Sequence, residues 1–264
     1  MDKNKLLKMA ENPNNIPGIY NYCDRWCERC QFTSRCLNFQ MGEEMEEGKE
    51  INDINNEEFW KHMDDIFTLT HEMLDDMAKE QGIDLSQIEW TEEDKEKERE
   101  LEESVQSHQC ATASEAYYDV VDEWFKAHEE LFKEKEVELN EQLFLGLPST
   151  DPEKEAVTLR DAVEVITFYV HFIHVKIMRA LHGKMEDGYE IPDEFPKDSD
   201  GSAKIALIAI DRSISAWGKL LKYLPKSEDE ILEILVLLEQ LRNMTEKEFP
   251  DARKFIRPGF DEGY

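Results

Sequence analysis

The chain has 264 residues, 40% of them hydrophobic, which is enough to bury a sizeable core. Asp and Glu total 61 against 31 Lys and Arg, so the formal net charge is −30. A chain this acidic repels phosphate backbones and anionic lipid surfaces, and we therefore expect neither nucleic acid nor a membrane as its partner. We find no signal-like start and no apolar run long enough to cross a bilayer, which predicts a cytoplasmic protein.

The first forty residues are rich in turn-forming asparagine, proline and glycine and contain four closely spaced cysteines. These are Cys23, Cys27, Cys30 and Cys36, in the spacing C-x3-C-x2-C-x5-C. Four thiolates this close together can bind one soft metal centre, and a reducing compartment favours a metal over disulfides. We therefore predict a loop-rich metal-binding segment over residues 1–41, the alternative being four unliganded thiols. Cys110 lies far away and is expected to be a core residue.

Zinc is the first expectation for this segment, because four thiolates complete its tetrahedral shell in a structural role. A 4Fe-4S cluster also takes four thiolates and is the alternative. The part Cys23-x3-Cys27-x2-Cys30 is similar to the three-cysteine motif of radical SAM enzymes. That resemblance covers eight residues. The rest of the chain lacks the alternating strands and helices of that family's barrel, so we do not assign the chain to it.

The remainder of the chain predicts helices, since apolar residues recur at helical spacing and period-two alternation is absent. An acidic linker is expected over residues 42–56 and an irregular tail over 249–264. Between them, residues 57–248 predict an antiparallel helical bundle of about five helices, and the fold class is all-α. The expected helices cover residues 57–79, 92–107, 113–145, 152–181, 202–223 and 227–243, with the second and third alternatively continuous. Their expected N-caps are Asn55 or Asn56, Thr91, Asp151 before Pro152, and Ser227 in a capping box with Glu230, and the expected stops are Gly82, Gly146 and Gly183.

A second metal site is a further hypothesis. Glu164, His171 and His174 lie near one another on a helical wheel, and Asp119 and Glu123 on the preceding helix offer carboxylates. Together they have the ligand types of a non-haem iron site. The paired Glu-x-x-His motifs of ferritin-like proteins are absent, however. The favoured interpretation is a polar helix side with hydrogen-bonded core histidines.

The sequence contains no Gly-x-Gly-x-x-Gly, Walker, Gly-x-Ser-x-Gly or His-Glu-x-x-His motif. We therefore expect a cytoplasmic metal-binding helical protein that acts as an interaction or regulatory module, with another protein as its partner. The alternative is an iron-dependent oxidoreductase. It would use a four-cysteine iron–sulfur cluster and the second, carboxylate and histidine, iron site.

Overall fold

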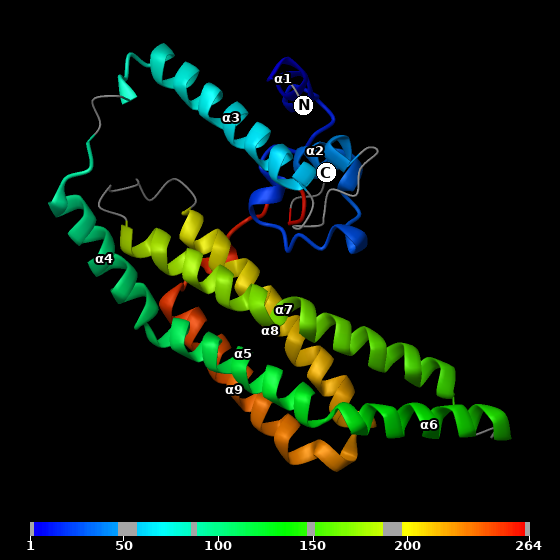
Figure 1. Cartoon of the computed structure of the whole chain (residues 1–264). Coiled ribbons are helices and arrows are strands. Elements are labelled where there is room, and N and C mark those ends of the chain that lie inside the picture. The colour runs from blue at the N-terminus through cyan, green and yellow to red at the C-terminus, as the bar shows by residue number, and fades with distance from the viewer. Residues whose placement is uncertain (1–2, 47–56, 86–88, 147–150, 187–196, 262–264) are drawn as a thin grey trace. The chain divides into compact units, whose positions relative to one another are not determined.

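The computed structural model describes residues 3–46, 57–85, 89–146, 151–186 and 197–261 (Figure 1). Throughout these ranges the secondary structure is helical and no strand occurs, which confirms the predicted fold class. Among the helices described, none combines the length and apolar character that crossing a bilayer requires. The chain forms two compact units. Residues 1–96 and 256–264 make the cysteine unit, and residues 97–255 make the helical unit.

The cysteine unit consists of short helices and 3-10 turns followed by one long helix. Its elements are α1 (Lys3–Ala10), η1 (Ile19–Asn21), η2 (Cys27–Arg29), η3 (Thr33–Arg35), α2 (Leu37–Glu46) and α3 (Glu57–Glu80). The sequence predicts a loop where α1 and α2 form, whereas α3 agrees with prediction to within one residue. Gly82 follows α3 with φ 70°, as its expected stop signal. The expected asparagine cap of α3 and residues 47–56 of the linker lie outside the described residues.

Hydrogen bonds join the two ends of the cysteine run. Ile16 donates its backbone N–H to the carbonyl of Arg35 at 3.0 Å, and the Arg35 side chain donates to the carbonyl of Asn14 at 3.0 Å. Gln40 donates to the side-chain oxygen of Asn15 at 3.0 Å. The residues before the first cysteine are thereby held against those around the last.

The helical unit begins within α4 (Glu92–Gln106) and ends after a short 3-10 turn. Its other elements are α5 (Gln109–Ala127), α6 (Glu129–Leu145), α7 (Pro152–Glu186), α8 (Asp198–Tyr223), η5 (Pro225–Ser227), α9 (Glu228–Glu248) and η6 (Ala252–Lys254). Helix α7 packs along α8, and α5 contacts both α7 and α9 (Figure 1). Trp217, Tyr117 and Tyr169 are fully buried between them. The Trp217 indole donates to the Tyr117 hydroxyl at 3.2 Å.

Two helix starts in this unit follow their predicted caps. Thr91 and Asp94 exchange hydrogen bonds at the start of α4, since the Thr91 hydroxyl accepts from the Asp94 N–H at 3.2 Å and Asp94 accepts from the Thr91 N–H at 3.0 Å. Asp151 accepts from the Lys154 N–H at 3.2 Å before Pro152 opens α7. Ser227 makes no side-chain cap at α9, so the capping box expected there is wrong.

Several helix boundaries differ from prediction, among them the start of α8, at Asp198, and the end of α9, at Glu248. The expected helix 113–145 is broken at His128. The His128 ring stacks on Trp124 with the ring centres 4.5 Å apart, and its Nδ1 donates to the Trp124 carbonyl at 2.8 Å. Gly183 does not end α7, which continues to Glu186. At Gly183 a Cβ would lie 3.6 Å from Ser199 of α8, an ordinary packing distance, so α7 and α8 are in contact there.

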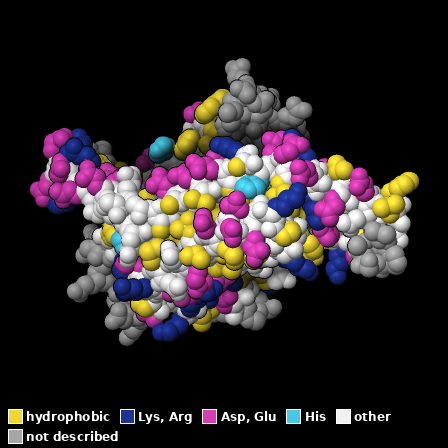
Figure 2. Space-filling view, turned by 90° about the horizontal axis from the view of Figure 1, so that it is seen from below, with side chains coloured by type: hydrophobic (Ala, Val, Ile, Leu, Met, Phe, Trp, Pro, Cys, Tyr) yellow, Lys and Arg dark blue, Asp and Glu magenta, His cyan; other side chains and the backbone are white. Residues whose placement is uncertain are grey.

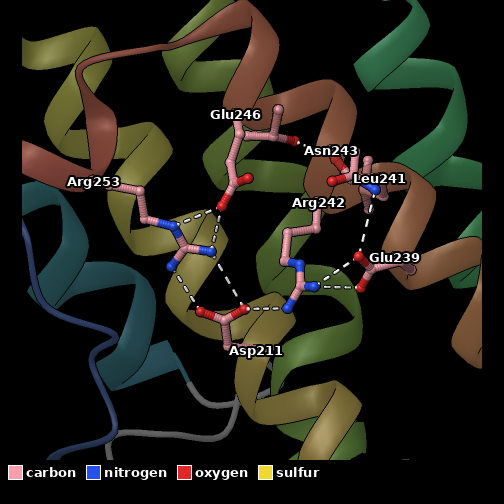
Figure 3. A network of polar contacts seen from close by, with 8 residues as sticks. Asp211, Glu239, Leu241, Arg242, Asn243, Glu246 and Arg253 are labelled. Carbon is pink, nitrogen blue, oxygen red and sulfur yellow. Dashed lines mark hydrogen bonds and ion pairs between the residues drawn. The ribbon is translucent and has the colours of Figure 1, made fainter.

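An ion-pair network fastens the end of the helical unit (Figure 3). Asp211 of α8 contacts Arg242 of α9 at 3.4 Å and Arg253 of η6 at 2.7 Å. Arg253 also contacts Glu246 of α9 at 2.8 Å. These side chains are partly exposed, so each pair contributes modestly, yet together they fix η6 against two helices. Elsewhere the acidic side chains are spread over the visible surface (Figure 2).

Candidate metal centre

All four predicted cysteines line one pocket in the cysteine unit. The cavity between them is small, about 20 Å³, and is partly open to solvent. Its wall is mainly apolar and aromatic, and besides the cysteines it includes Ile19, Tyr20, Trp26, Phe32, Phe39 and Phe260. Cysteines 23, 27, 30 and 36 thus share the wall of one pocket, and metal binding by them stays a prediction.

Tight turns of the backbone direct the sulfurs into this pocket. Cys27 begins η2, and the Cys30 N–H donates to the Cys27 carbonyl at 3.1 Å. Cys36 ends η3 by donating to the Thr33 carbonyl at 3.2 Å. Arg25, between the first two cysteines, has φ 59°, a left-handed conformation that residues other than glycine seldom adopt. The segment folds as consecutive turns, which bring neighbouring thiols to one side.

Backbone N–H groups point at two of the sulfurs. Phe32 donates its N–H to Cys30 Sγ at 3.4 Å, and the backbone of Arg25 hydrogen-bonds to Cys23. The Cys23 thiol itself donates to the Tyr20 carbonyl at 3.6 Å. N–H groups directed at sulfur stabilise thiolates and tune metal centres that bind them.

The thiols also influence one another electrostatically. Burial raises the pKa of Cys27, and the neighbouring Cys23, Cys30 and Cys36 raise it further. Burial also raises the pKa of Cys23, opposed by the hydrogen bond from Arg25 and reinforced by Asp24 and Cys36. Four thiolates crowded this closely repel one another, and a bound cation relieves that repulsion.

Within the described ranges, no three His, Cys, Asp or Glu side chains are gathered closely enough to hold a single metal ion. Arg29 lies at the rim, with its guanidinium 4.0 Å from the centre of the Trp26 ring.

The residues of the hypothetical second site are not brought together. His174 points inward and donates to Ser114 Oγ at 2.9 Å, since that hydroxyl donates to the Ala111 carbonyl. His171 is exposed and meets the Tyr118 ring edge-on at 5.9 Å. The carboxylates Asp119, Glu123 and Glu164 are all exposed. In this geometry His174 is a hydrogen-bonded histidine, and the carboxylates belong to a polar helix surface.

The fifth cysteine occupies the core of the helical unit. Cys110 is fully buried, and burial raises the pKa of its thiol to about 11. A thiol held protonated in this way is a poor nucleophile and a poor metal ligand. Its predicted role as a core residue is confirmed.

Comparisons with known proteins leave the site to be interpreted from its own chemistry. The chain matches no protein-family model, and neither the curated proteins nor the solved structures compared with it gave a significant match. Sequence reasoning identified the four cysteines but missed the aromatic wall, above all Phe260. The tail that carries Phe260 belongs to the cysteine unit, and its aromatic content was the one available signal.

Proposed function

We propose that Cys23, Cys27, Cys30 and Cys36 bind an iron–sulfur cluster, and that the protein is a cluster-dependent interaction or regulatory module. One observation carries the proposal: all four cysteines line a single pocket whose wall is otherwise mainly apolar and aromatic. In a 4Fe-4S cluster each thiolate binds a different iron, so the sulfurs stand around a volume instead of a point.

Zinc is the second candidate, and the turn at Cys27 and Cys30 favours it. Two cysteines separated by two residues in a 3-10 turn are a usual half of a zinc site. A zinc shell requires the other two sulfurs to close to about 2.3 Å from the same ion.

The surroundings of the pocket also support a cluster. The aromatic rings of Phe32, Phe39 and Phe260 line it, and Phe32 directs its N–H at a sulfur. Apolar shielding and N–H hydrogen bonds to sulfur are the means by which proteins tune cluster potentials. The segment has few buried apolar side chains of its own, so binding a metal would also stabilise its fold.

We further propose that the helical unit is an antiparallel bundle that serves as the interaction scaffold. Supporting this, Asp161 near the start of α7 pairs with Lys219 near the end of α8, whereas Arg179 near the end of α7 pairs with Asp198 at the start of α8. The net charge of −30 favours a protein partner with a basic surface. A cytoplasmic setting would keep the thiols reduced for metal binding.

Metal analysis of protein purified without oxygen tests the proposal. We expect about four iron atoms and matching sulfide per chain, with a visible charge-transfer band. Cys30→Ser should abolish the band and most of the iron. The matched control Cys110→Ser, a buried thiol outside the pocket, should keep both. Stoichiometric zinc without sulfide would replace the cluster by the second candidate, and no bound metal would overturn both.

A further inference from the structure

The last described residues of the chain, 256–261, form part of the cysteine pocket although more than two hundred residues of sequence separate them from it. Phe260 lines the pocket, and its ring meets Phe32 edge-on with the centres 5.1 Å apart. In Figure 1 this red segment lies beside the blue cysteine run. A bulky ring from the opposite end of the chain thus supplies one side of the pocket wall.

Hydrogen bonds and an ion pair within this segment hold it in a tight turn. The Arg257 N–H donates to an Asp261 carboxylate oxygen at 3.0 Å, and the Arg257 side chain pairs with the same carboxylate at 2.9 Å. The Phe260 N–H donates to the Arg257 carbonyl at 3.2 Å, and the guanidinium lies 4.9 Å from the Phe260 ring centre. We call residues 256–261 the C-terminal hook. These contacts fix where Phe260 points.

Gly259 allows the hook to seat against the interior of the cysteine unit. Its φ is 77°, and a Cβ there would lie 3.0 Å from Ile19 Cδ1 and 3.1 Å from Ile16 Cδ1. Both isoleucines are 2% exposed. Any side chain at 259 would meet strain in the backbone and a clash at the isoleucines, so glycine is required for this close approach.

The chain just before the hook is fixed to the helical unit. Arg253 joins the network of Figure 3, and the buried Phe255 accepts at its carbonyl a hydrogen bond from Lys204 of α8. Ile256, 57% exposed, is the first residue of the hook and follows directly. The chain is therefore anchored in one unit up to residue 255 and in the other from residue 257.

We infer that the C-terminal hook is a cover for the cysteine pocket, and that Phe260 slows exchange of the metal centre while it is seated. The inference rests on the proposed metal site for its function, but the cover itself does not depend on which metal binds. With Phe260 seated, a reagent reaches the sulfurs only through the open side of the pocket or by lifting the hook. The end of the chain would thereby control access to a site near its beginning.

Two rates measured on the full chain test the inference. The first is the reaction of the metal-free, reduced protein with a thiol reagent such as DTNB, and the second is metal loss from the loaded protein to a chelator. Phe260→Ala should raise both rates about tenfold or more, tenfold being the factor that corresponds to about 1.4 kcal/mol. The control Ile256→Ala, in the same segment but exposed, should leave both unchanged.

A second variant separates the cover from loss of an aromatic ring. Gly259→Ala keeps Phe260 but obstructs the seat on Ile16 and Ile19, and it should accelerate both reactions too. Circular dichroism should show the helical unit intact in each variant. If Phe260→Ala and Gly259→Ala react at the rate of the unaltered protein, the inference is overturned even where metal binds. If no metal binds, the proposed function fails, while the thiol reaction still decides whether the hook covers the pocket.

Discussion

The helical unit fully buries Trp217, Tyr117 and Tyr169, together with a continuous set of leucines and isoleucines. Within the described part of the cysteine unit, by contrast, the buried large apolar side chains are Ile16, Ile19 and Trp26. Since a fully buried side chain of this kind contributes about 1.5–3 kcal/mol, the first unit has ample stabilisation of its own and the second has little. The contrast teaches that one chain combines a unit with an extensive core and a unit with few buried apolar side chains, which the proposed metal site would stabilise.

The largest expected effect is on the stability of the helical unit. Trp217→Ala removes a fully buried indole whose ring centre lies 5.0 Å from that of Trp124. It also removes the indole N–H that donates to the Tyr117 hydroxyl. We expect a loss of about 3–5 kcal/mol in the free energy of unfolding, measured by urea denaturation. Val236→Ala on exposed α9 surface should cost less than about 1 kcal/mol. Comparable losses for both variants would contradict a core centred on Trp217.

An intermediate effect on stability is expected in the cysteine unit, at its proposed metal site. Removing the metal should raise hydrogen exchange across residues 13–39 and leave α7 and α8 protected, because ligand binding stabilises only the unit that binds. A site saturated at 100 times its dissociation constant loses about 2.7 kcal/mol in this way. Uniform loss of protection over both units would show that they unfold together and would abolish the contrast.

The smallest expected effect is a pH dependence in the helical unit. The hydrogen bond from Lys184 lowers the pKa of Glu248 below its ordinary 4.5, with His108 adding to the effect and burial opposing it. A lowered folded pKa means stabilisation that is present above pH 4.5 and lost as the pH falls through the folded value. Glu248→Gln should therefore cost about 1 kcal/mol at pH 7 and nothing well below pH 4.

Parallel denaturation curves of the unaltered protein and of Glu248→Gln across this pH range isolate the contribution of Glu248. Glu233→Gln, an exposed carboxylate on the same helix, serves as the control and should change stability little at any pH. A deficit for Glu248→Gln that persists unchanged at pH 3 would show that the Lys184 contact is unrelated to charge.

The sequence predicted helix starts best where the residues that cap a helix lie close together in the chain. Thr91 with Asp94, and Asp151 with Lys154, set their helix starts through contacts three residues apart, and both caps are as expected. The predictions failed where a distant residue decides. Ser199 packing on Gly183 lets α7 continue past a glycine, and His128 turning onto Trp124 divides a helix that apolar spacing alone made continuous.

The same limit applies to the site. Cysteine spacing predicted that the four sulfurs face one pocket, because nearby turns suffice to direct them. It did not predict Phe260, since a wall residue from the far end of the chain leaves no periodic signal. The predicted domain boundaries also differ from the two units, because α3 and the end of the tail group with the cysteine run.

Arg25 has a consequence for how the pocket meets its ligand. A left-handed residue other than glycine costs roughly 1–2 kcal/mol. Here that cost is borne when the turn folds, so the loop between Cys23 and Cys27 is already bent before any ion arrives. A metal centre would therefore meet a preorganised site with a positive side chain nearby. It would bind this site faster and more tightly than an unstructured peptide of the same composition.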